Sequence, residues 1–230
     1  MKKIANALLI AALTIFSSIA VFAETVDKDS WGPSSTGAIV YGQWDIADDG
    51  TVTSTLSPGW NQIYNGNHDA TDFTVKADIK WLETGSAEFP KFGLITTFQD
   101  VNNMTAAFLD KQFNVLAIFA KVQGQDDQWI NVDLPEDFDW SVAHELKVVK
   151  SGEQYEYFVD GEKLTTQEFA ISNGEIGLIT EDSKAEFANV SVEYPLPDTA
   201  TNSYNTLLFG ALLVAAGGAF FFLNRRKVNA

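Results

Sequence analysis

Phe73-Thr74-Val75-Lys76-Ala77-Asp78-Ile79-Lys80-Trp81 alternates between apolar and polar residues along its whole length. Successive side chains of a β-strand point to opposite faces, so this pattern predicts a strand with one packed face and one face in water. Between residues 36 and 194 no segment shows sustained helical periodicity. The sequence therefore predicts an all-β domain.

Similar short runs continue along the chain, separated by turn residues. They lie at 92–98, 104–109, 115–122, 129–132, 145–149, 155–159, 176–180 and 187–194. Asp160-Gly161 is typical of a tight hairpin turn, in which the central residues need positive φ. Strands at this spacing predict a two-sheet antiparallel sandwich over residues 36–194, and residues 24–35 read as a flexible leader.

The framework of this segment resembles the concanavalin-like jelly rolls, in particular the laminin-G-like domains and the family 66-type carbohydrate-binding modules. The resemblance covers most of the segment and implies the jelly-roll fold. Members of this family bind many kinds of ligand, so the fold does not name one. The matching stretches are Gly42-Gln43-Trp44, Asp49-Gly50-Thr51-Val52, Asn61-Gln62-Ile63-Tyr64, Phe92-Gly93-Leu94-Ile95, His144-Glu145-Leu146-Lys147, Phe158-Val159-Asp160-Gly161-Glu162, Gly174-Glu175-Ile176-Gly177-Leu178 and Ala185-Glu186-Phe187-Ala188-Asn189-Val190.

The N-terminus has the order of a secretory signal peptide. Lys2 and Lys3 precede an apolar run over residues 4–22, and Ala23 stands where a signal peptidase cleaves. The alternative is a buried N-terminal helix, which the charged start and the acidic stretch after Ala23 disfavour. We therefore expect residues 1–23 to be a signal peptide and the domain to act outside the cell.

The C-terminus combines an apolar span with a basic tail. Residues 207–223 contain no charged residue, and as a helix these residues would extend roughly 26 Å, near the lower limit for a transmembrane span. Residues 224–230 contain Arg225, Arg226 and Lys227, which predict a cytoplasmic tail.

Leu196-Pro197-Asp198-Thr199-Ala200 stands just before this span. A pentapeptide, an apolar span and a short basic tail in this order resemble the LPxTG-type sorting signal of sortase-anchored surface proteins of Gram-positive bacteria. The resemblance implies that sortase cleaves after Thr199 and transfers the Thr199 carbonyl to peptidoglycan. Ala200 replaces the common Gly, which leaves the sortase class open, and the alternative is a plain membrane anchor.

The charge and composition of the mature part disfavour anionic ligands. Of the 15 Lys and Arg residues, five lie in the two ends, so the mature part keeps 10 against 31 acidic residues and contains no arginine. This charge repels nucleic acid and anionic polymers, and without a guanidinium fork the domain is poorly equipped to grip carboxylate or phosphate. We therefore expect a neutral ligand or a cation. The chain also lacks cysteine, which excludes thiol catalysis and thiolate metal sites.

Catalytic motifs are absent from the sequence. The related family 16 glucanases use a Glu-x-Asp-x-x-Glu strand, and this chain has no such spacing. His68 lies in a turn-like stretch and His144 opens a strand, and neither lies near a serine nucleophile in the sequence or at metal-ligand spacing. We expect a protein that is not an enzyme. Carboxylates that converge from different strands would still allow a glycosidase or a lyase.

Two aromatic and polar stretches are candidate ligand-binding segments. Sugar rings stack their C–H faces on indole and phenol rings while polar neighbours bind the hydroxyls. We expect Trp44, Trp81 and Trp140 to fill the core, whereas Trp60 and Trp129 lie beside loops. The predicted ligand-binding residues are Trp60, Asn61, Tyr64, Asp126, Gln128 and Trp129.

Asp48-Asp49 and Asp126-Asp127 are candidates for calcium, which prefers oxygen ligands on loops. The chain has no Asp-x-Asp-x-Asp-Gly loop, and such pairs are more often turns in solvent, so the metal stays unassigned.

The sequence thus favours a cell-wall-anchored protein with a non-catalytic carbohydrate-binding jelly roll for neutral glycans. A second hypothesis is an adhesin that binds a host or bacterial protein, for which a large apolar surface patch would speak. A third, less favoured, is a glycoside hydrolase or lyase.

Overall fold

The computed structural model describes residues 21–35, 42–65, 69, 71–86 and 89–195. The sorting motif 196–200, the apolar span 207–223, the basic tail 224–230, His68 and nearly all of the expected signal peptide lie outside the described residues. Within the described part no helix is long and apolar enough to cross a membrane. Residues 23–194 form one compact unit.

Strands are the main secondary structure of this unit, as the alternating sequence predicts, and the helical part of its described residues is one 3-10 turn, η1 (Lys28–Ser30). The strands are β1 (Val21–Thr25), β2 (Trp31–Gly32), β3 (Trp44–Ile46), β4 (Val52–Ser54), β5 (Trp60–Asn65), β6 (Asp72–Thr84), β7 (Lys91–Asp100), β8 (Asn103–Asp110), β9 (Val115–Lys121), β10 (Gln128–Asp133), β11 (Ala143–Ser151), β12 (Gln154–Val159), β13 (Glu162–Glu168), β14 (Glu175–Glu181) and β15 (Ser183–Pro195).

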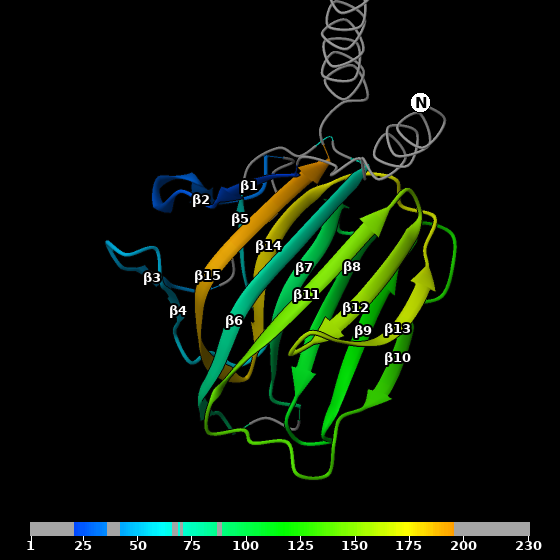
Figure 1. Ribbon diagram of the computed structural model, residues 1–230. Helices are drawn as coiled ribbons and strands as arrows, with labels where there is room; N and C mark the ends of the chain where they lie inside the picture. Colours follow the sequence, from blue (N-terminus) through cyan, green and yellow to red (C-terminus); the bar gives the residue numbers. More distant parts are fainter. Residues whose placement is uncertain (1–20, 36–41, 66–68, 70, 87–88, 196–230) are drawn as a thin grey trace, which may run out of the picture. The chain divides into compact units, whose positions relative to one another are not determined.

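The strands form two antiparallel sheets that pack face to face (Figure 1). One sheet has the order β13-β12-β11-β6-β15-β4-β3, with β1 also paired to β15. The other has the order β10-β9-β8-β7-β14-β5-β2. Hairpins of consecutive strands alternate with pairs of strands that are distant in the sequence, such as β6 with β15 and β7 with β14, which is typical of a jelly roll. The all-β sandwich is therefore confirmed.

The main core lies between the sheets. The apolar face of β6 contributes Phe73, Val75 and Ile79, each 2% exposed or less, while the polar residues between them face outward. Trp44, Trp81 and Trp140 pack against this core but are only partly buried. Trp44 contacts Phe187 with 5.9 Å between ring centroids.

A second apolar cluster lies on the outer face of the β10–β2 sheet. Its members alternate with the core residues along the same strands, so both faces of the central strands are apolar. Phe108 and Phe119 belong to it and are 0% and 4% exposed. This second cluster forms the base of the site described below.

Residues 24–35 differ from the expected leader. They include η1 and β2, and Trp31 and Gly32 pair with Asn65 and Tyr64 of β5. Trp31 also packs against the core. A strand of two residues has no visible alternation, so its pairing with a distant strand could not be read from the sequence.

Two backbone positions require glycine. Asp160 and Gly161 have φ of 50° and 81° and form the predicted tight turn between β12 and β13. Gly93 of β7 lies so close to β8 that a Cβ there would be 1.8 Å from the carbonyl oxygen of Ala107. Any side chain at this position would therefore push two central strands apart.

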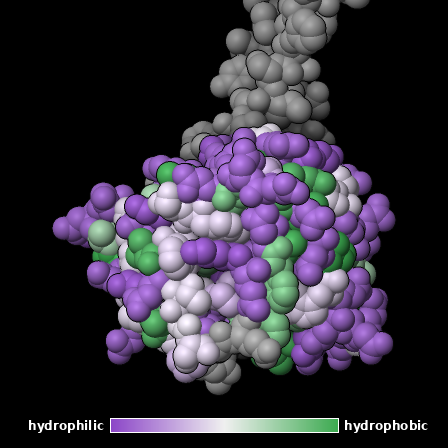
Figure 2. Space-filling model, turned by 90° about the horizontal axis from the view of Figure 1, so that it is seen from below, coloured by the Kyte–Doolittle hydropathy of each residue, from purple (hydrophilic) through white to green (hydrophobic). Residues whose placement is uncertain are grey.

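One face of the molecule is largely hydrophilic, in keeping with the excess of acidic residues. Seen from below the view of Figure 1, hydrophilic residues dominate and the hydrophobic residues form separate small patches (Figure 2). No broad apolar surface of the kind that protein adhesins use is visible on this face.

Candidate functional site

The register of the β10–β2 sheet aligns charged and aromatic residues in one row across five strands. Trp60 pairs with Glu181, Glu181 with Lys91, and Lys91 with Asp110. Asp110 in turn pairs with Val115 of β9. Cross-strand partners project from the same face, so residues far apart in the sequence converge there.

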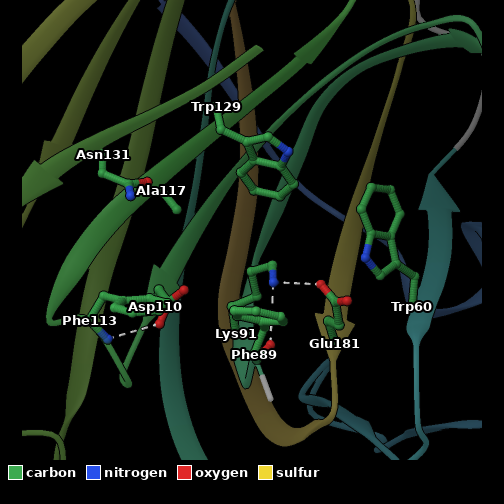
Figure 3. Close-up of a pocket in the computed structure, with 9 residues that line it drawn as sticks. All are labelled: Trp60, Phe89, Lys91, Asp110, Phe113, Ala117, Trp129, Asn131 and Glu181. Carbon is green, nitrogen blue, oxygen red and sulfur yellow. Dashed lines mark hydrogen bonds and ion pairs between the residues drawn. The ribbon is translucent and has the colours of Figure 1, made fainter. Parts of the chain in front are cut away.

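This row forms the floor of an open pocket of about 360 Å³ on the outer face of the sheet (Figure 3). That volume lies in the range of small-ligand sites. The lining residues come from β5, β7, β8, β9, β10, β14 and two connecting loops: Trp60, Phe89, Lys91, Asp110, Phe113, Ala117, Trp129, Asn131 and Glu181.

Trp60 and Trp129 flank the pocket from opposite strands of the sheet (Figure 3). Both indoles pack on Phe119, with centroid distances of 5.5 Å and 4.8 Å, and both also contact Phe108. These contacts to buried rings fix the orientation of the indoles. Trp129 nevertheless remains 47% exposed, so part of its ring is available to a ligand.

Phe89 and Phe113 form an aromatic rim on the side of the pocket away from Trp60. Their rings stack at 6.2 Å, and the side chains are 44% and 53% exposed. Together with Trp129 they are the exposed aromatic side chains among the described residues. Exposure of three large aromatic side chains at one place is unfavourable in a protein without a ligand and is typical of a binding site.

The loop that carries Phe113 is held by its own polar side chains. Asp110 Oδ1 accepts hydrogen bonds from the backbone N–H groups of Gln112 (3.0 Å) and Phe113 (3.2 Å). Asn114 has φ of 53°, and its amide donates to the carbonyl of Leu134 at 3.2 Å. This turn chemistry holds the rim in place before any ligand arrives.

Lys91 provides the basic group at the floor. Its Nζ lies 2.6 Å from Glu181 Oε2 and donates a hydrogen bond of 3.3 Å to the carbonyl of Phe89. The ammonium also lies 5.4 Å from the ring centroids of both Phe89 and Trp129. The Lys91 side chain is 8% exposed, so the ion pair is well shielded from water.

Asp110 and Asn131 offer further polar groups to the pocket. Figure 3 shows the second carboxylate oxygen of Asp110 directed away from the turn, and within the described residues this oxygen has no hydrogen-bonding partner. Asn131 is exposed and its amide has no partner in the same part of the chain. Aromatic walls with a few convergent polar groups are the usual composition of a sugar site.

Of the predicted ligand-binding residues, Trp60 and Trp129 meet at this pocket, whereas Asn61 and Tyr64 are buried beside it. Asn61 is 0% exposed and donates to the carbonyl of Thr55 at 2.7 Å. Tyr64 is 1% exposed and donates to Gln62 Oε1 at 2.7 Å. Neither side chain lines the pocket.

Asp126 and Gln128 lie away from the pocket, at the turn between β9 and β10. Asp126 is exposed. Gln128 lines a separate cavity of about 250 Å³ together with Gln125, Glu153 and Glu168. Its amide donates to Gln125 Oε1 at 3.3 Å.

The pocket residues that the sequence did not suggest are Phe89, Lys91, Asp110, Phe113, Ala117, Asn131 and Glu181. Asn131 could have been found, because it lies two residues after Trp129 and so faces the same side of a strand. Lys91, Asp110 and Glu181 converge only through the register of β7, β8 and β14, which the local sequence does not reveal.

The remaining candidate groups take part in structural contacts. His144 lies between Asp160 Oδ2 (2.6 Å) and the carbonyl of Asp139 (2.8 Å). Asp48 pairs with Lys28 at 2.7 Å. Asp49 accepts from the Thr51 backbone N–H, which lowers the pKa of its carboxyl group. Among the described residues no three potential metal ligands lie together.

Solved structures share this fold at low sequence identity. A carbohydrate-binding module, CBM66, from Bacillus subtilis is 21% identical, with a TM-score of 0.57 over 72% of this chain and 96% of the module. The endo-β-1,3-glucanase from Pyrococcus furiosus is 15% identical, with a TM-score of 0.50 over 75% of this chain and 90% of the enzyme. The GlcNAcα1-4Gal-releasing endo-β-galactosidase from Clostridium perfringens is 9% identical, with a TM-score of 0.53 over 76% of this chain and 61% of the enzyme. The concanavalin-like jelly roll is thus confirmed.

No curated protein sequence matches the chain. At the C-terminus, residues 196–230 match the family model of the LPXTG cell wall anchor motif. This motif is the signal for processing by sortase and attachment to peptidoglycan. The chain is therefore that of a sortase-anchored surface protein of the cell wall, with a jelly-roll domain of the type found in carbohydrate-binding modules and glycoside hydrolases.

Proposed function

We propose that this protein is a non-catalytic glycan-binding protein of the cell wall and that the pocket between Trp60 and Trp129 is its ligand site. The observation that supports this most is the convergence of two tryptophans, two exposed phenylalanines and unpaired polar groups on one pocket. Flat aromatic faces beside hydrogen-bonding groups match the amphipathic surface of a sugar ring. The likeness to a carbohydrate-binding module agrees with this proposal.

The charges of the pocket favour a glycan without acidic groups, and neutral glycans fit this requirement. Asp110 and Glu181 outnumber Lys91, which is already paired with Glu181 at 2.6 Å. A carboxylate, sulfate or phosphate on the ligand would meet an uncompensated negative charge with no arginine to bind it. Uronic acids, sialic acid and teichoic phosphates are therefore disfavoured.

The carboxylates of the pocket are better placed for structure and binding than for glycoside hydrolysis. A glycosidase needs one carboxyl group that donates a proton and a second that acts as a nucleophile or base. Glu181 is ion-paired with Lys91, and one oxygen of Asp110 holds the turn before Phe113. This arrangement supports binding over catalysis.

A broad glycan array probed with residues 21–195 tests the proposal. We expect selective binding to glycans that lack acidic groups. The Trp129→Ala variant should weaken this binding about tenfold or more, since a stacking contact contributes about 1–2 kcal/mol. Val101→Ala, which removes another exposed side chain away from the pocket, is the matched control and should bind as the parent does.

A blank array would count against glycan binding and would favour the adhesin that binds a protein. Equal binding by Trp129→Ala and by the parent would place the site elsewhere. Release of reducing ends from the bound polysaccharide would show that the domain is a hydrolase.

A further inference from the structure

Two carboxylate oxygens at the pocket have no partner among the described residues. Asp110 uses one oxygen for the turn and leaves the other toward the cavity, while Glu181 binds Lys91 with Oε2 and leaves Oε1 (Figure 3). The donors at the pocket are the remaining N–H of Lys91, the amide of Asn131 and the indole N–H groups of Trp60 and Trp129. The two free acceptors belong to carboxylates, and hydrogen bonds to a charged acceptor are stronger than those to a neutral one, so the floor favours a ligand that brings an N–H or O–H donor to them.

The balance of charge at the floor points the same way. The positive charge of Lys91 and the negative charge of Glu181 cancel in their ion pair at 2.6 Å. The negative charge of Asp110 is therefore not compensated. Asp110 is only 5% exposed, and among the described residues its carboxylate has no ionic partner. A partly buried carboxylate without a counter-ion is unfavourable and is stabilised when a cation binds.

The aromatic rings around the floor tolerate a primary ammonium, as Lys91 itself shows. Its Nζ lies 5.4 Å from the centroids of Phe89 and Trp129 and 6.0 Å from that of Phe108. These distances are typical of cation–π attraction, so the ring faces add a negative potential to that of the carboxylates. The same potential acts on a ligand ammonium in the cavity between the rings.

We propose that the pocket recognises a sugar that carries a protonated primary amine, that is, a non-acetylated amino sugar of a glycan. The amine donates hydrogen bonds to the free oxygens of Asp110 and Glu181, and the sugar ring lies against Trp129. This inference rests on the proposed function and adds the chemical group that the site selects. An N-acetyl group would remove the positive charge and two of the three N–H donors.

The experiment compares three β-1,4-linked tetrasaccharides that differ only at C2, where glucose has a hydroxyl, N-acetylglucosamine an acetamide and glucosamine an ammonium. The same comparison in the galacto configuration covers the epimer at C4. Titration calorimetry at about pH 6 should show that the amino sugar binds about tenfold tighter than both matched sugars. This is the gain in affinity expected from one charge-assisted hydrogen bond between the ammonium and a carboxylate. Raising the pH until the amine is neutral should remove the preference.

Asp110→Asn tests the role of the carboxylate. Asparagine keeps an oxygen that can accept the N–H groups of Gln112 and Phe113, and a circular dichroism spectrum and a melting curve establish that the variant folds. We expect the ratio of amine to hydroxyl affinities to fall toward one. Asp126→Asn removes the same charge from the exposed turn outside the pocket and should keep the ratio.

The outcomes separate the two proposals. Glycan binding on the array without any preference for the amine would overturn this inference and leave the proposed function standing. An array on which no glycan binds would remove both. If Asp126→Asn abolished the preference for the amino sugar as fully as Asp110→Asn, the preference would come from the net charge of the domain. That result would also overturn the site assigned here.

Discussion

Lys91 and Glu181 form an ion pair at the centre of the pocket, with 2.6 Å between Nζ and Oε2. They lie on adjacent strands and are partners in the register of β7 and β14. The pair thus connects the floor of the pocket to the pairing of two central strands.

Breaking this pair should lower stability. Lys91→Met leaves the Glu181 carboxylate, 23% exposed, without its partner, and we expect the free energy of unfolding to fall by about 1–3 kcal/mol. The double variant Lys91→Met/Glu181→Gln should lose less than the sum of the two single variants. Urea unfolding of all four proteins measures this coupling.

The pair of Lys163 and Glu156 is the control for this cycle. It has the same 2.6 Å distance, but its side chains are 44% and 32% exposed. Its coupling should be about 0.5 kcal/mol or less. Equal coupling in the two cycles would contradict the view that the pocket shields the Lys91 pair.

Gly93→Ala should destabilise the domain strongly, by about 3 kcal/mol or more, because the new methyl group meets the carbonyl oxygen of Ala107 at 1.8 Å. Gly32→Ala is the matched control, since a Cβ there has no neighbour within 4 Å. Thermal unfolding compares the two, and a small loss in both would show that β7 and β8 can move apart easily.

Lys150 should contribute strongly to stability through hydrogen bonds to backbone carbonyls, with the carboxylates of Asp72 and Glu153 nearby. It is 1% exposed, and its ammonium donates to the carbonyls of Thr71 (2.9 Å), Gly152 and Ser172. Lys150→Met leaves these carbonyls without a donor and should cost about 2–4 kcal/mol in urea unfolding. The half-exposed Lys184, changed to Met, should cost about 0.5 kcal/mol or less. A similar loss at both would argue against this role.

Tyr155 should make the domain sensitive to alkali. Burial raises the pKa of its hydroxyl group to about 12. The unfolded chain loses this proton near pH 10, so stability from Tyr155 is fully present below pH 10 and is lost as the pH rises toward about 12. This rise in the pKa of Tyr155 corresponds to a loss of about 2–3 kcal/mol in the free energy of unfolding.

Tyr155→Phe should reduce this dependence. The variant loses the hydrogen bonds to the carbonyl of Ile171 and to Thr97, so it starts less stable at pH 8. Between pH 10 and 12 its free energy of unfolding should fall less steeply than that of the parent. Parallel curves in urea unfolding at a series of pH values would rule out Tyr155 as the titrating group.

The strands and turns of the fold were predictable because they depend on local patterns. The alternation over residues 73–81 predicts a strand, and β6 spans Asp72–Thr84. Asp160-Gly161 predicts the tight turn that follows β12. The short strand β2 was missed because two residues carry no period, and only its pairing with β5 defines it.

The site was predictable only in part, and strand geometry explains why. Trp60 and Trp129 stand beside turns and reach the pocket, but Asn61 follows Trp60 in the same strand and must face the other side. The alternation of side chains along a strand already separates Asn61 from Trp60 in the sequence. The convergence of Lys91, Asp110 and Glu181 was not predictable, since it depends on the pairing of strands that are far apart in the chain.

The last strand, β15, ends at Pro195, and the sorting motif begins at the next residue. Cleavage after Thr199 would leave four residues between the sandwich and peptidoglycan, a tether of at most about 14 Å when fully extended. With so short a tether the domain would stay close to its attachment point on the peptidoglycan. Saccharides at that attachment point would therefore be the glycans nearest to the domain.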